Sequence, residues 1–465
     1  MLCYFPLDGQ GYSGARREHR LAAGRQPLLA LVLMGMLMVC VGGCGRRTTP
    51  APTPLPTPTA TVAPLRTVEP TRAGAAEENS VLTLTWWTPE FVSPQAREPA
   101  GSLLAQYLAD FEAAYEGRVR VVPVLKARYG RGGLFDFLRA AQPVAPGILP
   151  DIVTLDIVEL PAAGGLGLLQ PLDNLLDEQT LARLYPFARQ AGQFTEHLLA
   201  VQFIADLQHV GYIRSRVENP PDTWDALLAG RMPYLFPIAS PQPLSALAPA
   251  EDVQPVFISH YLSAGGRLDL TTHQLVLEEQ PLLQTLSFYA AARDAGILPA
   301  EAAEVKELDE IWSVYVRGVV PIAQVSVQRF LAERANLPNI GFAATPGLSG
   351  PAPAVSTGWA LAVVTPDPAR QQAAAAWIAW LLQPERAGRL AAAIGWLPTS
   401  AEALQVAGSD PYYQFLDEQL ATAACHPAGA EYSQVAPRLH KAVEAVLKSG
   451  AAPEEAVEAA LGMPR

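Results

Sequence analysis

The sequence has few cysteines and few charged side chains for its 465 residues. Four cysteines are too few for a scaffold of this size to depend on disulfides. Charged residues make up 17% of the chain, and 45 acidic residues against 33 Lys and Arg give a net charge of −12. We expect no nucleic-acid binding, because neutralising phosphates requires clustered basic residues. With half of its residues apolar, the chain has the composition of a folded protein with two lobes or domains.

Sequence motifs of catalysis and of metal binding are absent as well. No Gly-x-x-x-x-Gly-Lys, His-Glu-x-x-His or Gly-x-Ser-x-Gly segment occurs, which excludes a P-loop, a zinc-protease helix and a nucleophile elbow. Cys425-His426 has no further metal ligand close to it in the sequence. We therefore expect no catalytic residue, no metal and no cofactor. Carboxylates are plentiful, so an extracellular glycan hydrolase with a pair of acids stays open as an alternative.

The N-terminus has the pattern of an export signal. Positive residues precede an uncharged apolar segment at 28–41, and small residues follow it. Val41-Gly42-Gly43-Cys44 resembles a bacterial lipobox, in which the Cys44 thiol accepts a lipid. We expect residues 1–43 to be a lipoprotein signal peptide and Cys44 to anchor the protein to the outer face of the cytoplasmic membrane. An uncleaved signal anchor is the alternative.

A tether rich in Pro and Thr precedes the folded part of the chain. Proline favours extended polyproline II, so residues 44–79 are predicted to act as a semi-rigid spacer. From Ser80 onward, strand patterns at 81–87, 119–125 and 151–155 alternate with helical patterns. This alternation predicts βαβ units and a fold of the α/β class.

Several separated segments resemble the extracellular solute-binding proteins of bacterial ABC importers, the family that includes maltose-binding protein. Each segment alone is short, but their order and spacing over roughly 81–460 match the family. They are the strand at 82–87 with the Phe111-Glu112 helix after it, 150–156, 167–173, 200–212, 220–227, 358–363, 395–399 and 431–433.

The resemblance implies a periplasmic-binding-protein-like fold of type II, with two lobes joined by a hinge. Each lobe would be a mainly parallel sheet flanked by helices. Solute binding in the cleft between the lobes stabilises the closed form, because the ligand contacts both lobes only when they are shut. The implied bounds are lobe one at 81–206 plus 340–384, lobe two at 213–339 plus 385–465, and crossings near 207–212, 340–345 and 384.

The implied function is binding rather than catalysis. We expect a membrane-anchored, monomeric protein that captures a solute, expected to be a mono- or oligosaccharide, and delivers it to ABC permease subunits. Sugars are held by aromatic rings on their C–H faces and by carboxylates or amides on their hydroxyls. Strand ends that face the cleft suit both kinds of contact. Nine ligand-binding residues are predicted on these grounds: Trp87, Glu90, Asp156, Asp206, Ser326, Gln328, Trp359, Trp396 and Tyr432.

Structural roles stay open for most of these nine residues. Packing is the alternative for Trp87 and Trp396, a helix cap for Asp156 and a hinge salt bridge for Asp206. Ser326 and Gln328 stand where relatives have a glycine and a stacking tryptophan. The missing aromatic ring favours a smaller or more polar ligand, or else a sensor or partner-docking lipoprotein whose cleft no longer binds sugar.

Overall fold

The computed structural model describes residues 81–241, 251–299, 302 and 304–462. The predicted signal peptide at 1–43 and tether at 44–79, Cys44 included, lie outside the described residues. Within them, no helix is both long and apolar enough to cross a membrane.

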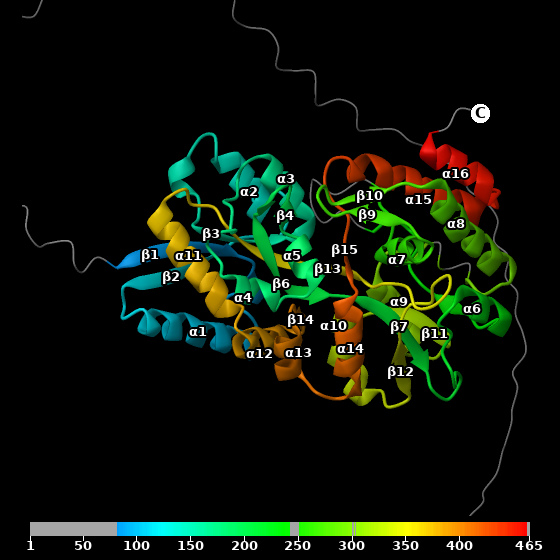
Figure 1. Cartoon of the computed structure of the whole chain (residues 1–465). Coiled ribbons are helices and arrows are strands. Elements are labelled where there is room, and N and C mark those ends of the chain that lie inside the picture. The colour runs from blue at the N-terminus through cyan, green and yellow to red at the C-terminus, as the bar shows by residue number, and fades with distance from the viewer. Residues whose placement is uncertain (1–80, 242–250, 300–301, 303, 463–465) are drawn as a thin grey trace, which may run out of the picture. The chain divides into compact units, whose positions relative to one another are not determined.

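A seven-stranded mixed sheet forms one half of the folded body (Figure 1). The strand β1 lies parallel to β2 and to β3, whereas β13 runs antiparallel to β3 and β6. All five residues of β3 are buried, as its apolar sequence predicts for a strand covered on both faces. The strands are β1 (Leu82–Thr88), β2 (Val119–Leu125), β3 (Ile152–Asp156), β6 (Ala200–Asp206), β13 (Val355–Val363), β14 (Leu397–Pro398) and β15 (Ala424–Cys425).

Amphipathic helices pack against this sheet and against one another. Trp86 of β1 meets Trp377 edge to face at 5.7 Å between ring centroids, and its indole N–H donates to the Thr154 hydroxyl. The sheet therefore packs on aromatic rings on the side where α11 (Pro368–Leu381) lies. The helices are α1 (Ala100–Ala114), α2 (Leu134–Ala141), α11 (Pro368–Leu381), α12 (Pro384–Ile394) and α13 (Ala401–Ala407).

A four-stranded mixed sheet forms the other half. Its central strand β7 is antiparallel to β11 and β12, and β11 is parallel to β8. Helices α7 (Pro255–Ser263), α8 (Glu279–Asp294), α9 (Leu308–Tyr315), α15 (Tyr432–Ser449) and α16 (Pro453–Leu461) belong to this half of the body. The strands are β7 (Gln208–Ile213), β8 (Tyr234–Leu235), β11 (Ile322–Ser326) and β12 (Ile340–Ala343).

Strand pairing corrects three features of the predicted architecture. Both sheets are mixed rather than mainly parallel. Residues 340–343 were expected in lobe one, but β12 pairs with β7 in the four-stranded sheet. Residues after 384 were expected in lobe two, but β14 pairs with β6 in the seven-stranded sheet. Pro384 begins α12, where its fixed φ suits a first helical turn, so the chain does not leave the first half there.

A single residue separates the two sheets at the first crossing. Asp206 ends β6 in one sheet, and Gln208 begins β7 in the other, with Leu207 between them. Leu207 is buried, with 2% of its surface exposed, and its carbonyl accepts a hydrogen bond from Val327 N. The crossing is thus a nearly continuous extended segment with little slack.

Candidate functional site

Asp156 lies at the carboxyl end of β3, and no Lys or Arg of the described residues forms a salt bridge with it. Its Oδ2 accepts a hydrogen bond from the Tyr129 hydroxyl, and its Oδ1 accepts one from Val158 N at 3.1 Å. Only 8% of its surface is exposed, and this burial raises the pKa of the carboxyl above its usual value. Asp156 also caps the short helix 157–159, so the structural alternative and a site position coexist in one residue.

Four aromatic rings gather beside this carboxyl, and we call them the aromatic cluster: Phe91, Tyr129, Trp359 and Trp396. Trp359 is the register partner of Asp156 on the neighbouring strand. Its ring centroid lies 5.5 Å from that of Phe91 and 5.7 Å from that of Tyr129. Phe91 is stacked on Trp396 with 15° between their planes. The cluster brings together segments that are up to about 300 residues apart in sequence.

A glycine fixes the position of Trp359. Gly358 has φ +146°, which side chains other than glycine rarely adopt, and a Cβ there would lie 2.2 Å from the carbonyl oxygen of Ile204. Directly after it, the pairing of β13 with β6 shifts register between Trp359 and Ala360. The bulge turns the strand locally and allows β6 to approach it closely.

A second polar group belongs to the half built on the four-stranded sheet. The Tyr432 hydroxyl donates to Asp252 Oδ1 at 2.6 Å, and Val253 N donates to the same carboxyl at 2.7 Å. Burial raises the pKa of Asp252, as it does for Asp156. His426 interacts electrostatically with both carboxyls and partly offsets the effect of burial on each. It therefore lies near acids from both halves of the molecule.

Asp206 occupies the first crossing. Its Oδ1 accepts a hydrogen bond from Gln328 N at 3.2 Å, and burial raises the pKa of the carboxyl to about 7. The other groups that lower this pKa are backbone N–H groups, and no Lys or Arg of the described residues is among them. The alternative of a hinge salt bridge is thus not supported for Asp206.

The remaining predicted residues have different surroundings. Ser326 caps α10 (Val327–Glu333) by accepting from Arg329 N at 3.1 Å, so its hydroxyl is used locally. Gln328 contributes a backbone N–H to Asp206. Trp87 is 3% exposed and lies under the Lys126 ammonium and against Phe137 rather than in the aromatic cluster. Glu90 is exposed beside Phe91.

Four residues of the site were missed by the sequence analysis: Phe91, Tyr129, Asp252 and His426. Phe91 and Tyr129 follow the ends of β1 and β2 by three and four residues, so the strand-end argument that selected Asp156 applies to them too. No pattern marks Asp252 or His426. Their proximity depends on how the second half folds back on the first.

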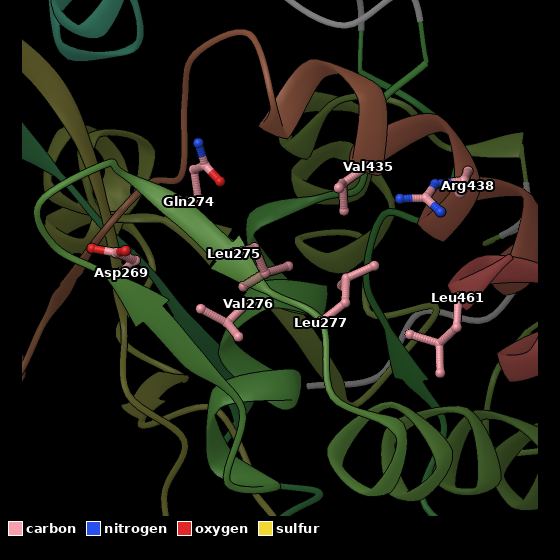
Figure 2. A pocket seen from close by; sticks show the side chains of 8 residues that line it. All are labelled: Asp269, Gln274, Leu275, Val276, Leu277, Val435, Arg438 and Leu461. Atoms are coloured by element: carbon pink, nitrogen blue, oxygen red, sulfur yellow. The ribbon is translucent and has the colours of Figure 1, made fainter. Parts of the chain in front are cut away.

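A separate cavity of about 390 Å³ lies on the second half, and none of the nine predicted residues lines it. Figure 2 shows apolar side chains of β10 (Gln274–Val276) and its C-terminal extension facing α15 and α16 across the opening, with Arg438 at the rim. Among the described residues, no group of three His, Cys, Asp or Glu side chains is placed to hold a metal ion.

Comparison with known proteins decides the family. Residues 106–414 match the model of the bacterial extracellular solute-binding protein family. The chain belongs to this family. The solute-binding protein is accordingly a binding protein and not an enzyme, which confirms that prediction and sets aside the hydrolase alternative.

Solved structures show the fold of this solute-binding protein. The cyclic α-maltosyl-1,6-maltose binding protein from Arthrobacter globiformis is 20% identical, with a TM-score of 0.65 over 82% of this chain and 97% of that one. The sugar-binding protein MalE from Xanthomonas citri is 18% identical, with a TM-score of 0.65 over 82% and 96%. An ABC transporter solute-binding protein from Thermotoga lettingae is 21% identical, with a TM-score of 0.57 over 82% and 97%. The predicted α/β periplasmic-binding-protein fold is confirmed.

Proposed function

We propose that the protein is the membrane-anchored substrate-binding component of an ABC importer that captures a carbohydrate between its two halves and delivers it to the permease. The aromatic cluster beside Asp156 is the observation that carries the proposal. Rings present apolar faces to the C–H surface of a sugar, and a desolvated carboxylate accepts hydrogen bonds from hydroxyls that would otherwise be buried unpaired.

The supply of hydrogen-bond acceptors favours a neutral polyhydroxylated ligand. Asp156 and Asp252 receive their hydrogen bonds from phenols and backbone N–H groups, and their pKa values are raised by burial. An anionic solute would find acceptors there, with no Lys or Arg of the described residues hydrogen-bonded to either carboxyl. Two structural neighbours are described as binding proteins for cyclic α-maltosyl-1,6-maltose and for sugar, and a third is described as bound with α-D-tagatose. These descriptions agree with this class.

Closure would follow from the distribution of these groups. The aromatic cluster and Asp156 belong to the half built on the seven-stranded sheet, whereas Asp252 and Tyr432 belong to the other. A solute that contacts both sets binds the closed arrangement better, and this difference in affinity shifts the population toward closure. Two lobes with the strand pairing described above, a monomeric state and a lipid anchor at Cys44 complete the proposal. Anchoring is tested by Cys44→Ser, which should release the protein from the membrane fraction.

A binding screen tests the proposal. The chain lacking residues 1–74, which lie outside the described residues, is melted with mono- and oligosaccharides, amino acids, polyols and phosphates. A solute present at 100 times its dissociation constant adds about 2.7 kcal/mol of stability, which is visible as a melting shift. We expect sugars alone to shift the melting temperature. Shifts with amino acids or phosphates only would contradict the carbohydrate assignment.

Two tryptophans provide a matched pair of variants. Trp396→Ala removes a partly buried ring of the aromatic cluster, and Trp380→Ala removes a partly buried ring that instead packs on Phe111 of α1. We expect sugar affinity to fall about ten-fold in the first variant and to stay within two-fold in the second. Equal losses in both variants would locate the sugar elsewhere, and no shift with any solute would favour the sensor or docking alternative.

A further inference from the structure

Two small hairpins from opposite halves of the molecule touch each other. The first consists of β4 (Gln193–Phe194) and β5 (His197–Leu198), and the second of β9 (Arg267–Asp269) and β10 (Gln274–Val276). Nε2 of His273, in the turn of the second hairpin, lies 2.5 Å from the carbonyl oxygen of Gln193 in the first. Since a carbonyl only accepts, the imidazole must carry a proton on Nε2 and donate it.

The first hairpin is fixed to the half built on the seven-stranded sheet. Leu172 N donates to Leu198 O at 2.7 Å, and Leu198 N donates to the Asp173 carboxyl at 3.1 Å. Phe194 packs against Gly164 in the helix that follows β3. Leu199, which leads into β6, donates back to Gly192. The Gln193 carbonyl is therefore held in place by its own half.

The second hairpin is fixed equally firmly to the other half. Tyr261 of α7 donates from its hydroxyl to Val276 O at 2.6 Å and accepts from Glu278 N at 2.9 Å. Arg267 pairs with Glu278 at 2.9 Å across the base of the hairpin. The Asp269 carboxylate holds the turn by accepting from the backbone N–H of Thr271. These contacts hold the turn, and with it His273, in a fixed position relative to the second half.

His273 has an unusual conformation and little access to solvent. Its φ is +57°, a left-handed value that non-glycine residues seldom adopt, and only 7% of its surface is exposed. Its own carbonyl accepts a hydrogen bond from Ala428 N at 2.9 Å. Ala428 belongs to the segment after β15, in which His426 N donates to Ser356 O of the seven-stranded sheet. Strained backbone persists where surrounding contacts enforce it, and such positions are frequent at clamps and switches.

We propose that the His273 clasp, formed by His273 with Gln193 and Ala428, holds the two halves closed by direct protein contacts that need no solute. The inference rests on the proposed function, because it assigns the clasp to the closing motion of a binding protein. The clasp lies outside the aromatic cluster, so the solute does not have to contribute to it. A protein that is partly closed beforehand binds more tightly, because less of the solute's interaction energy is spent on closing it.

Distance measurements on the full chain test the clasp. Spin labels are attached to Gln179→Cys on the first half and Glu279→Cys on the second, both exposed positions, in a full-length chain whose Cys3, Cys40 and Cys44 are replaced by Ser. The fourth native cysteine, Cys425, is buried. We expect the protein without solute to show a short-distance population. His273→Asn tolerates the left-handed backbone but is too short to reach Gln193, and it should lower the ratio of closed to open molecules about five-fold.

Two further variants separate the hydrogen bond from a general loss of structure. His273→Gln carries an amide N–H at a similar reach and should restore part of the short-distance population. His197→Asn alters an exposed histidine on the first hairpin, whose ring contacts Asp173, and should leave the distances unchanged. Identical distributions for the wild type and His273→Asn would overturn the clasp, as would a His273→Gln variant as open as His273→Asn. The comparison is made without solute, so it stands even if no sugar in the screen binds.

Discussion

Two aspartates at opposite ends of β3 have the same chemistry and different surroundings. Asp151, just before the strand, is gripped by Arg370, whose guanidinium nitrogens lie 2.6 Å from both carboxylate oxygens. It also accepts from the backbone N–H of Thr85 at 2.7 Å. Asp156, at the other end, accepts from Tyr129 and Val158, and no cationic side chain of the described residues hydrogen-bonds to it. One carboxylate is neutralised within the protein, whereas the other is the acceptor that we propose for the ligand.

The two aspartates mark two different edges of one sheet: the amino edge carries a stabilising ion pair, and the carboxyl edge carries the proposed binding site. An Arg370 fork saturates Asp151 and joins α11 to the amino ends of the strands. At the carboxyl edge, burial outweighs the opposing effect of His426 and raises the pKa of Asp156, and four aromatic rings lie nearby. Perturbed carboxyls in a recess are frequent at functional sites, whereas paired ones report on stability.

Breaking the amino-edge pair should have the largest effect on stability. Asp151→Asn leaves Arg370 without its carboxylate, and a partner lost from such a largely buried pair costs about 3 kcal/mol of unfolding free energy. Urea unfolding measures this loss, and the affinity of the folded protein for sugar should stay unchanged. If Asp151→Asn unfolded at the same urea concentration as the wild type, the ion pair would contribute nothing to stability. The contrast between Asp151 and Asp156 would then lose its basis.

The equivalent change at the carboxyl edge should act on binding instead. Asp156→Asn keeps an oxygen to accept from Val158 N, so the stability should change by less than about 1 kcal/mol. Affinity for sugar should fall about ten- to a hundred-fold, because hydrogen bonds to a charged acceptor are lost. Calorimetric titration provides the measurement. Unchanged affinity would make Asp156 a cap for the following helix and no more.

A third carboxylate, that of Asp206 at the first crossing, should make the free energy of unfolding depend on pH. Burial raises the pKa of Asp206 from 3.8 to about 7, so between these pH values the folded protein keeps a proton that the unfolded chain releases. Stability contributed by this protonation is present below about pH 4 and is lost as the pH rises through 7. Asp206→Asn should therefore be more stable than the wild type at pH 8 by about 1–2 kcal/mol, allowing for partial exposure, and about equally stable at pH 4. If the difference in stability between Asp206→Asn and the wild type did not change with pH, titration of the Asp206 carboxyl would be excluded as its cause.

The smallest expected effect concerns Ser326, which lies in the second sheet. Ser326→Ala removes the cap of α10 and should cost about 1 kcal/mol of stability. Sugar affinity should stay within two-fold of the wild type if the hydroxyl acts only as a cap. A ten-fold loss of affinity with little change in melting temperature would instead restore the ligand contact that the sequence predicted.

Sequence reasoning found the features that depend on local pattern. The strands β1, β2 and β3 follow from alternation and apolar runs, and Asp156 follows from its place at a strand end. Trp359 beside it could be expected from the family resemblance. Their direct register pairing could not, because it depends on how β13 aligns with a strand about 200 residues earlier.

The parts that were missed depend on contacts between distant segments. β14 has two residues, too few for a periodic pattern, and pairs with a strand that ends about 190 residues before it. Tyr432 reaches Asp252 from the start of α15, which packs against α8, so this contact joins residues 180 positions apart in the sequence. For Ser326 the sequence could not separate the two roles, because a serine before a helix satisfies the cap rule as well as a ligand role.

The first residues of β13 have a consequence for sensor engineering. Thr357 pairs with Asp206 at the first crossing, and Val355 and Ser356 pair with Ala424 and Cys425 on the returning chain. Two connections between the halves thus meet within three residues of the strand that carries Trp359. An environment-sensitive fluorophore at residues 355–357 would respond both to movement of the chain at 424–425 and to occupation of the aromatic cluster. This short stretch is therefore a suitable position for an optical readout.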